Sequence, residues 1–543
     1  MTCTSLAYAH PGGDLLFTDV SFHVSPGDHV GVVGANGAGK STLFRVLTGA
    51  LRLDDGDFTV GGRLGYMPQD VGVGDDARTV RELLTALAPN ALRGAGQRMH
   101  GAERALAQGD DSAGMELGAA IGEWSALGGY ELEAQWDAAC RRIVRASFGE
   151  LADRQAATLS GGERKRLVLD VLFGSDAEVL LLDEPDNFLD VPAKRELEQQ
   201  IAASRKTILL ISHDRDLLSS AVRSVLTLEG NGCWVHPGSY ATYPEAREER
   251  QRKLGDAVKR WKEEERRLHR LMKTFKERAR YSSDWAKKAD AAETRWQRFA
   301  DSGPPPAPVG DQQIRMRIRG GDSARLALVV KQLGITDMVM PFSDEVHFGE
   351  RVAVVGPNGG GKTSLMRAFA GENGLALSGE VRVGNRVSIG HFTQLNVRGD
   401  FSGRKVLDVV VERVPGVERA MAALARYGLA EAAGRQYDVL SGGQKARLEI
   451  LCLELDGHNL LLLDEPTDNL DIDSSEALEG ALEGFEGTVV AVSHDRAFLR
   501  RMDRFLMVLH DGSVLALPDF DSMMEALVEP ELAREVRFAK VLT

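Results

Sequence analysis

The chain has 543 residues, 43% of them apolar, and a formal net charge of −14. This length is too great for one ordinary hydrophobic core, and the apolar fraction argues against disorder of the whole chain. Four scattered cysteines without a CxxC spacing argue against a disulfide framework or a zinc site, and no apolar run reaches the roughly 18 to 20 residues of a membrane-spanning helix. Because the N-terminus has no signal-peptide pattern either, we expect a cytoplasmic protein without membrane insertion.

A short apolar strand at 30–33 runs into a glycine-rich turn, GANGAGKS at 34–41, and then into a predicted helix. A phosphate-binding loop requires this order of elements, because its glycines let backbone N–H groups converge on phosphate. We expect Lys40 to contact the β and γ phosphates and Ser41 to bind Mg2+, with the helix N-terminus adding a favourable dipole.

An Ala-rich segment near 88–139 looks helical. It accounts for an excess of 41 residues in the first half, because Lys40 and Ser160 are 120 positions apart whereas Lys362 and Ser441 are 79 apart. The segment is therefore predicted to be a helical insertion.

A second apolar strand, at 179–182, is followed by two carboxylates. Asp183 is placed to hold Mg2+ through water, and the adjacent Glu184 to polarise an attacking water. The pattern predicts that catalytic residues lie at the carboxyl end of this strand.

A charged segment follows the first half. Residues 244–300 contain 18 Lys and Arg against 11 Asp and Glu, a local balance of +7 in an acidic chain. Two stripes of apolar residues at helical spacing lie on either side of 276–284, formed by Leu254, Trp261, Leu268 and Phe275 and by Trp285, Ala289, Ala292, Trp296 and Phe299. They predict an antiparallel helical hairpin with its tip near 278–283, ended by the proline-rich connector at 303–308.

The second half repeats the motifs of the first in the same order, with GPNGGGKT at 356–363, LSGGQ at 440–444 and LLLDEP at 461–466. In both halves the LSGG serine lies 23 positions before the strand-end aspartate, and the aspartate lies 30 positions before the histidine of an SHD motif. Such a shared register indicates an internal duplication.

The combination of phosphate loop, Q-loop, LSGG turn and SHD motif resembles the ATP-binding cassettes, over essentially both halves. The resemblance implies an α/β fold with two P-loop ATP-binding cassette domains, at 1–240 and 311–543, joined by an α-helical hairpin linker at 241–310. It also implies an ATP hydrolase that binds two ATP and two Mg2+, with the cassettes stacked head to tail so that each ATP lies between one phosphate loop and the opposite LSGG turn.

The same resemblance assigns residues to roles. Catalytic roles fall to Glu184, Glu465, His213 and His494. Nucleotide contacts in the first half fall to Gly34, Asn36, Gly37, Gly39, Lys40, Ser41, Thr42, Gln69, Ser160, Gly161 and Gly162. Those in the second half fall to Gly356, Asn358, Gly359, Gly361, Lys362, Thr363, Ser364, Gln394, Ser441, Gly442 and Gly443. The Mg2+ ligands are Ser41, Gln69, Asp183, Thr363, Gln394 and Asp464.

The two halves depart from the cassette pattern in different ways. Such cassettes usually stack an aromatic ring on adenine; the first half offers Tyr8 or His10, and the second half has no obvious aromatic residue between 331 and 340. After the glutamate the halves read PDNFLD and PTDNLD, where the family more often has Thr-Asn-His between Pro and Leu. We therefore expect unequal hydrolysis at the two sites.

Twin cassettes, the GSYATY lead-in at 238–243 and a charged linker of about 70 residues together resemble the ABC-F family, the translation-associated branch of the cassette proteins. In that family the linker reaches from the ribosomal tRNA exit site toward the peptidyl-transferase centre. The resemblance implies a monomer that binds the ribosome through rRNA and tRNA. Candidate RNA contacts are Lys273, Lys276, Arg278, Arg280, Tyr281, Lys287 and Lys288.

The sequence PFSDEVHFGER at 341–351 is similar to actinobacterial resistance-type members of that family. The expected function is protection against macrolide, lincosamide or streptogramin antibiotics, or regulation of translation. One alternative is the ATP-hydrolysing subunit of a macrolide-type exporter with a separate transmembrane partner. A DNA-repair or cohesin-like cassette is disfavoured, because the linker is too short for a long coiled-coil arm. The insertion at 88–139 is either an arm that contacts the exit-site stalk or an enlarged helical subdomain.

Overall fold

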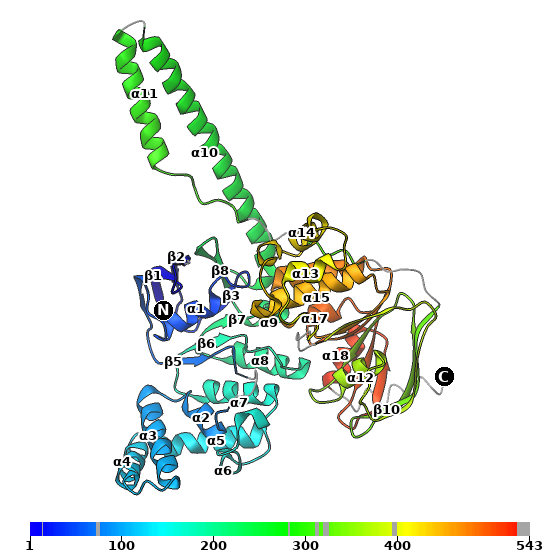
Figure 1. Ribbon diagram of the computed structural model, residues 1–543. Helices are drawn as coiled ribbons and strands as arrows, with labels where there is room; N and C mark the ends of the chain where they lie inside the picture. Colours follow the sequence, from blue (N-terminus) through cyan, green and yellow to red (C-terminus); the bar gives the residue numbers. More distant parts are fainter. Residues whose placement is uncertain are drawn as a thin grey trace. The chain divides into compact units, whose positions relative to one another are not determined.

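The computed structural model describes residues 1–13, 15–71, 77–280, 283–309, 314–318, 325–393 and 399–528, except for the side chains of Ser283 and Asp284. The chain divides into two compact units, one of 1–237 with 313–543 and one of 238–312. The first unit holds both halves of the repeat, and the second holds the charged segment (Figure 1).

The first half forms a nine-stranded sheet of order β4-β1-β2-β9-β8-β3-β7-β6-β5. Its strands are β1 (Thr2–Ala9), β2 (Leu15–His23), β3 (His29–Val33), β4 (Asp55–Thr59), β5 (Leu64–Met67), β6 (Val179–Asp183), β7 (Thr207–Ile211), β8 (Ser224–Glu229) and β9 (Gly232–His236). Strands β3, β6 and β7 pair in parallel and are buried at every position, as expected of apolar runs covered on both faces.

The second half forms a six-stranded sheet of order β14-β15-β16-β12-β17-β18 and a three-stranded sheet of order β11-β10-β13. Its strands are β10 (Leu326–Ile335), β11 (Val339–His347), β12 (Arg351–Val355), β13 (Leu377–Val383), β14 (Ile389–Phe392), β15 (Leu460–Asp464), β16 (Thr488–Val492), β17 (Arg504–Val508) and β18 (Val514–Leu517). The parallel neighbours β12, β16 and β15 repeat the arrangement of β3, β7 and β6, so both halves carry their motifs on equivalent strand ends.

The helices of the first half are α1 (Lys40–Leu47), α2 (Val80–Thr85), α3 (Asn90–Ala107), α4 (Ala113–Ala126), α5 (Gly129–Ile143), α6 (Phe148–Leu151), α7 (Gly161–Gly174), α8 (Val191–Ala203) and α9 (Arg215–Ala221). Those of the second half are α12 (Lys362–Phe369), α13 (Val406–Val411), α14 (Val417–Arg426), α15 (Gly442–Asp456), α16 (Ile472–Glu483), α17 (Arg496–Leu499) and α18 (Phe520–Val528). Four helices of the first half, α1, α7, α8 and α9, correspond to α12, α15, α16 and α17 of the second. Ser160 and Ser441 each close a capping box at the start of α7 and α15, which fixes the backbone of both LSGG turns.

Helices α3, α4 and α5 lie in the part of the first half that we interpreted as an insertion. They pack around Trp124 and Trp136, which are fully buried with ring centroids 6.2 Å apart. The segment shares this small core with residues of α2, α6 and α7.

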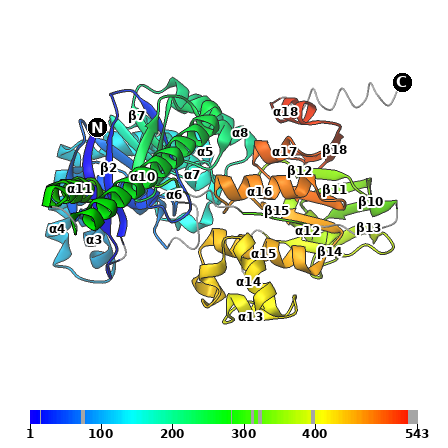
Figure 2. The ribbon, with the colours of Figure 1, turned by 90° about the horizontal axis from the view of Figure 1, so that it is seen from above.

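The second unit contains α10 (Tyr243–Ala279) and α11 (Ser283–Asp301), drawn in green in Figure 1 and in Figure 2. Aromatic pairs join the two helices: Trp261 stacks on Phe299 with centroids 5.5 Å apart, and Phe275 meets Trp285 at 5.5 Å. This helical hairpin and the two α/β halves confirm the fold class expected from the sequence. Within the described residues, no helix has both the length and the apolar character needed to cross a membrane.

Candidate functional site

Both phosphate loops leave a buried strand and enter a helix, β3 to α1 and β12 to α12. Their first glycines, Gly34 and Gly356, have φ of 154° and 147°. A Cβ would lie 2.5 Å from the carbonyl oxygen of Leu228 at Gly34 and 2.4 Å from that of Val508 at Gly356. Only glycine fits both the backbone conformation and the space at these positions.

The loop lysines lie inside their loops. Lys40 Nζ donates to the carbonyl oxygens of Gly34 at 2.7 Å and Ala35 at 3.1 Å, and Lys362 Nζ makes the equivalent pair of contacts at 3.0 and 2.9 Å. Burial lowers the pKa of both lysines. Carbonyl oxygens of the loop thus take the place of water around each ammonium group. The ammonium lies at the position where a phosphate-binding loop contacts phosphate.

The strand-end aspartates, Asp183 and Asp464, are each 1% exposed. In the described part of the chain, both carboxylate oxygens of Asp183 and one of Asp464 lack a hydrogen bond of ordinary geometry, although the hydroxyls of Ser41 and Thr363 lie near enough to favour the charged carboxylates. Burial raises the pKa of Asp183 to about 7 and raises that of Asp464. Unsatisfied carboxylate oxygens beside a hydroxyl are the kind of oxygen ligands that fit Mg2+.

Two amides hold the glutamate of the first site. Gln69 Nε2 donates to Glu184 Oε2 at 2.8 Å, and Asn187 Nδ2 donates to the same oxygen at 2.7 Å. His213 Nε2 lies 3.9 Å from Glu184 Oε1, and burial lowers the pKa of this imidazole to about 3. The neutral ring and the two amide donors leave Glu184 as an oriented proton acceptor.

The glutamate of the second site has different neighbours. The backbone N–H of His494 donates to Glu465 Oε2 at 3.1 Å, and His494 Nε2 lies 3.5 Å from Oε1. Burial and then the nearby Asp468 raise the pKa of Glu465 well above its ordinary value, and burial lowers the pKa of His494. Asp468 has the sequence position that Asn187 has in the first half, so a carboxylate replaces an amide donor here.

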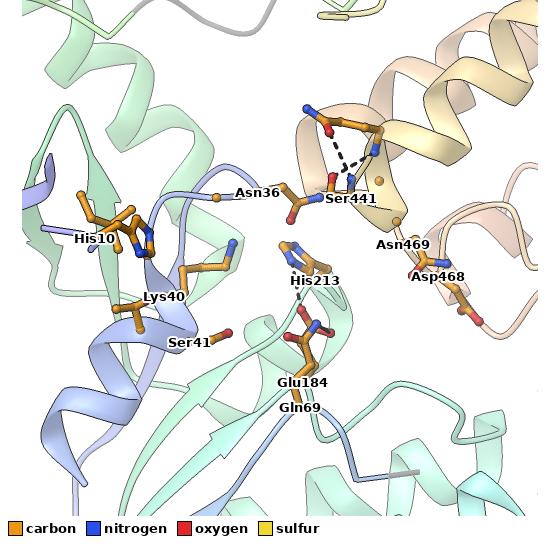
Figure 3. A pocket seen from close by; sticks show the side chains of 17 residues that line it. His10, Asn36, Lys40, Ser41, Gln69, Glu184, His213, Ser441, Asp468 and Asn469 are labelled. Carbon is orange, nitrogen blue, oxygen red and sulfur yellow. Dashed lines mark hydrogen bonds and ion pairs between the residues drawn. The ribbon is translucent and has the colours of Figure 1, made fainter. Parts of the chain in front are cut away.

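The first phosphate loop and the second LSGG turn line one cavity of about 470 Å³, shown in Figure 3. The backbone N–H of Asn36 in this loop donates to Asp471 Oδ2 of the other half at 3.2 Å. The sequence-predicted residues on its wall are Asn36, Gly37, Gly39, Lys40, Ser41, Thr42, Gln69, Glu184, His213, Ser441, Gly442 and Gly443.

The second phosphate loop and the first LSGG turn line another cavity, of about 770 Å³. Asn358 Nδ2 donates to the carbonyl oxygen of Phe188 across the two halves at 2.7 Å. The sequence-predicted residues on its wall are Ser160, Gly161, Gly162, Asn358, Gly359, Gly361, Lys362, Thr363, Ser364, Asp464, Glu465 and His494. Each cavity is therefore built from both halves, in the head-to-tail manner that the cassette resemblance implies.

Some of the sequence-predicted site residues do not line either cavity. Gly34 and Gly356 shape the loops from the strand ends, and Asp183 is buried and is not among the described residues that line the first cavity. Gln394 and Tyr281 lie outside the described residues.

The structure distinguishes the two candidates for contact with the adenine base, Tyr8 and His10. Tyr8 is 8% exposed and packs on Phe17 in the core, whereas His10 lines the first cavity. Met338 lines the second cavity, in the segment where the sequence has no aromatic residue. The roles of both residues remain predictions.

The sequence interpretation missed several residues of the cavity walls, among them Asn187, Asp468, Asn469, Gln444 and Lys194. The register between the halves held a usable signal. Asp183 and Asp464 are 281 positions apart. A comparison of residues at this offset pairs Lys194 with Ser475, a difference in charge between the halves that lies outside the sequence motifs.

Reciprocal ion pairs join the halves beside the cavities. Arg215 pairs with Glu479 of the other half, and Arg496, at the same 281-position offset, pairs with Glu198. Charged hydrogen bonds of this kind fix the two halves in register.

The candidate RNA contacts on the hairpin fall into two groups. Lys276 pairs with Glu293 at 2.6 Å, and Arg278 and Lys288 lie 5.1 and 4.5 Å from the centroid of the Trp285 ring. The other described candidates, Lys273, Arg280 and Lys287, are exposed.

Comparisons with known proteins match both halves of the chain to the same family. The ABC transporter family model matches residues 17–187 and 339–468. An antibiotic resistance protein of Mycobacteroides abscessus is 43% identical, over 94% of this chain and 97% of its own length. The tylosin resistance ATP-binding protein TlrC of Streptomyces fradiae is 33% identical, over 92% and 95%. The energy-dependent translational throttle protein EttA of Mycobacterium tuberculosis is 31% identical, over 92% and 89%.

Among solved structures, the archaeal ribosome recycling factor aABCE1, in complex with the stalk protein aP1, has a TM-score of 0.61 at 19% identity and covers 96% of this chain and 92% of its own. This likeness supports the fold. The two matched segments carry both phosphate loops and both strand-end carboxylate pairs, and the relatives match over the hairpin as well as the cassettes. The chain therefore belongs to the ATP-binding cassette family and, within it, to the ABC-F branch, beside its antibiotic-resistance members.

Proposed function

We propose that the protein hydrolyses ATP at both composite cavities and uses ATP-driven closure of its cassettes to act on the ribosome. The observation that carries the ATPase proposal is that each phosphate loop shares a cavity with the LSGG turn of the opposite half. Bound nucleotide would be contacted from both cassettes at once, so its binding energy would favour the closed arrangement.

The residues support a hydrolytic mechanism. Backbone N–H groups of the loop and the buried ammonium of Lys40 or Lys362 would bind the phosphates. Glu184, oriented by two amide donors, or Glu465 would accept the proton of the attacking water. A neutral His213 or His494 would contact the γ phosphate from the side of the glutamate. Mg2+, held by Ser41, Asp183 and Gln69 in the first site and by Thr363, Asp464 and Gln394 in the second, would offset charge on the phosphate oxygens.

The ribosomal part of the proposal rests on the relatives and on the hairpin. Two relatives are named for antibiotic resistance and one for throttling translation. The hairpin has an excess of cations in an acidic chain, and its exposed Lys273, Arg280 and Lys287 can neutralise RNA phosphates. We propose that the protein works as a monomer in the cytoplasm, where it protects ribosomes against macrolide, lincosamide or streptogramin antibiotics. The other ribosomal role, regulation of translation, would use the same contacts between the hairpin and RNA.

The decisive experiment is ribosome pelleting of the Glu184→Gln, Glu465→Gln variant with ATP. We expect this variant to pellet with ribosomes at least about tenfold more than wild type, because ATP stays bound and the cassettes stay closed. In the same background, Lys273→Ala with Arg280→Ala and Lys287→Ala tests the hairpin, and Arg252→Ala with Lys253→Ala and Lys259→Ala, three exposed cations on α10, is the matched control for charge.

Protection is then measured as translation in a cell-free system inhibited by a macrolide. Wild type is expected to restore translation, the hairpin-tip variant to lose that effect and the control variant to keep it. Absence of ATP-dependent pelleting, together with recovery of the protein in the membrane fraction of cells, would instead support the exporter-subunit function.

A further inference from the structure

One turn of the first cassette, at 186–189, carries neighbouring residues that contact both sites. Asn187 Nδ2 donates to Glu184 in the first site at 2.7 Å. The carbonyl oxygen of the next residue, Phe188, accepts a hydrogen bond at 2.7 Å from Asn358 Nδ2 in the second phosphate loop, and Phe188 lines the second cavity. The second loop is therefore contacted by a backbone group of the opposite cassette.

Phe188 has an unfavourable backbone conformation. Its φ is 64°, in the left-handed region, which costs free energy for a bulky residue. A backbone hydrogen bond closes the same turn in both halves, and a left-handed third residue in such a turn is usually Gly or Asn. The second half has Asn469 there, 281 positions on, yet this described residue is not left-handed. Local preference therefore does not explain the conformation of Phe188.

A buried lysine contacts the side chain of Phe188. Lys165, on α7, is fully buried, and its Nζ lies 5.4 Å from the centroid of the Phe188 ring. The same ammonium donates to the carbonyl oxygen of Glu184. A desolvated cation is attracted to the face of an aromatic ring, so this contact favours one position of the ring. At the 281-position offset the second half has Ala446, which offers no cation.

The backbone at Glu184 does not depend on this lysine. Glu184 and Glu465 have the same φ, 48°, although the second half has Ala446 where the first has Lys165. What distinguishes the first half is the contact between the ammonium and the ring of Phe188.

The first phosphate loop contacts the other half in a different way. The backbone N–H of Asn36 donates to Asp471 Oδ2 at 3.2 Å. Asp471 also caps the start of α16 through its side chain, which fixes this carboxylate. The partner of the first loop is thus a helix cap, whereas the partner of the second is the carbonyl of a strained residue.

We propose that Lys165 and Phe188 are positioning residues of the second nucleotide site, supplied in trans by the first cassette. The ammonium holds the ring of Phe188 and, through it, the left-handed backbone whose carbonyl orients Asn358. The second phosphate loop binds ATP tightly only while this turn keeps its strained form, and the first loop has no such requirement. This inference rests on the proposed ATPase function.

The test measures single-turnover ADP formation at each site over a range of ATP concentrations, in the full chain. Glu184→Gln leaves the second site to report, and Glu465→Gln leaves the first. Lys165→Met removes the cation and keeps most of the side-chain length. We expect it to raise the half-saturating ATP concentration of the second site about five- to tenfold and to change the maximal rate less than about twofold, because the loop binds phosphate before the reaction.

The first site is the internal control for damage to the fold. Lys165 belongs to the first cassette and touches the backbone of Glu184, so a merely structural defect would appear in the first site at least as strongly. We expect the first site to change less than about twofold. Arg166→Met removes a partly exposed cation of the same helix, paired with Glu196, and is expected to change neither site more than about twofold.

Substitutions at Phe188 test the backbone and leave the buried lysine in place, so they decide the matter even where Lys165→Met does not fold. Phe188→Gly tolerates the left-handed conformation and is expected to keep the half-saturating ATP concentration of the second site within about threefold. Phe188→Val disfavours that conformation and is expected to raise it about tenfold. In the Phe188→Gly background, Lys165→Met is expected to add less than about twofold, because no ring remains for the ammonium to hold.

Three results would each overturn the inference while leaving the ATPase intact. They are equal losses at both sites for Lys165→Met, equal losses at the second site for Phe188→Gly and Phe188→Val, and an undiminished effect of Lys165→Met beside Phe188→Gly. Absence of ADP formation in both parent variants and in wild type would instead reject the ATPase function, and the inference with it.

Discussion

The two proposed nucleotide sites share one backbone frame and differ in the side chains around Glu184 and Glu465. In the first site, Glu184 accepts hydrogen bonds from two amide side chains of its own cassette. In the second, Glu465 accepts a hydrogen bond from the backbone N–H of His494, and Asp468 stands at the sequence position of the amide Asn187. The frame depends on features that tolerate little change, such as glycines at positive φ and buried parallel strands. The residues around the glutamates are under no such constraint. A duplicated chain can therefore keep one frame in both halves while the side chains around each glutamate diverge.

The largest expected effect concerns the ion pairs that join the halves. Arg496 is 5% exposed and contacts Glu198, Asp214 and Asp216, whereas Arg215 contacts Glu479 as its main partner. Arg496→Ala takes the cation from Glu198, whereas Asp214 keeps Lys194 and Asp216 keeps Arg500. It is expected to cost about 3 kcal/mol, in the range for breaking a buried pair.

Arg215→Ala is expected to cost less, about 1 kcal/mol, because Glu479 keeps Arg501 at 3.0 Å. The midpoints of thermal unfolding without nucleotide compare the two variants. A fall for Arg215→Ala as large as that for Arg496→Ala would show that the two contacts are energetically equivalent and that the asymmetry is confined to the cavities.

The next effect concerns the LSGG turns. A Cβ at Gly443 would lie 2.6 Å from the carbonyl oxygen of Asn469 and 2.8 Å from Asn36 Nδ2, whereas a Cβ at Gly162 would lie 3.0 Å from the carbonyl oxygen of Phe188. Gly443→Ala is therefore expected to slow the first site about 10- to 100-fold, since overpacking typically costs 1–3 kcal/mol. Gly162→Ala should slow the second site only about threefold, because the displacement it requires is smaller.

Single-turnover ADP formation in the Glu465→Gln and Glu184→Gln backgrounds measures the two effects. An equal fall in the rate of ADP formation at both sites would contradict the predicted difference between the two LSGG turns. It would mean that both turns relax in the closed, nucleotide-bound state.

The sequence predicted the repeated frame well, because phosphate loops and strand-end carboxylates combine a fixed spacing with a required chemistry. The hairpin was predictable for a similar reason: residues such as Trp261 and Phe275 recur at seven-residue intervals and meet Phe299 and Trp285 across the two helices. Lys194 could not be assigned, because α8 carries it far from every motif of the second half and only tertiary packing brings it to the cavity that Glu465 also lines. The choice between Tyr8 and His10 also needed the structure, since both precede the loop at plausible distances and only burial separates them.

The smallest expected effect concerns contact with the nucleotide base. His10 lines the first cavity, and its ring lies edge-on to Tyr8, 5.7 Å between centroids, which limits its rotation. Met338 in the second cavity is 48% exposed and has only the hydroxyl of Ser364 near its sulfur, at 3.7 Å, as a polar contact among the described residues.

We expect His10→Ala to weaken ATP binding at the first site about fivefold, in line with about 1 kcal/mol for an aromatic stack. Met338→Ala is expected to weaken the second site only about twofold, because a flexible thioether is less ordered before binding. Binding of a fluorescent ATP analogue measures both, with Lys362→Ala silencing the second site in one series and Lys40→Ala silencing the first in the other. If Met338→Ala weakened binding as much as His10→Ala, thioether and imidazole would be equivalent platforms for the base, and the difference between the sites would lie wholly in the residues around their glutamates.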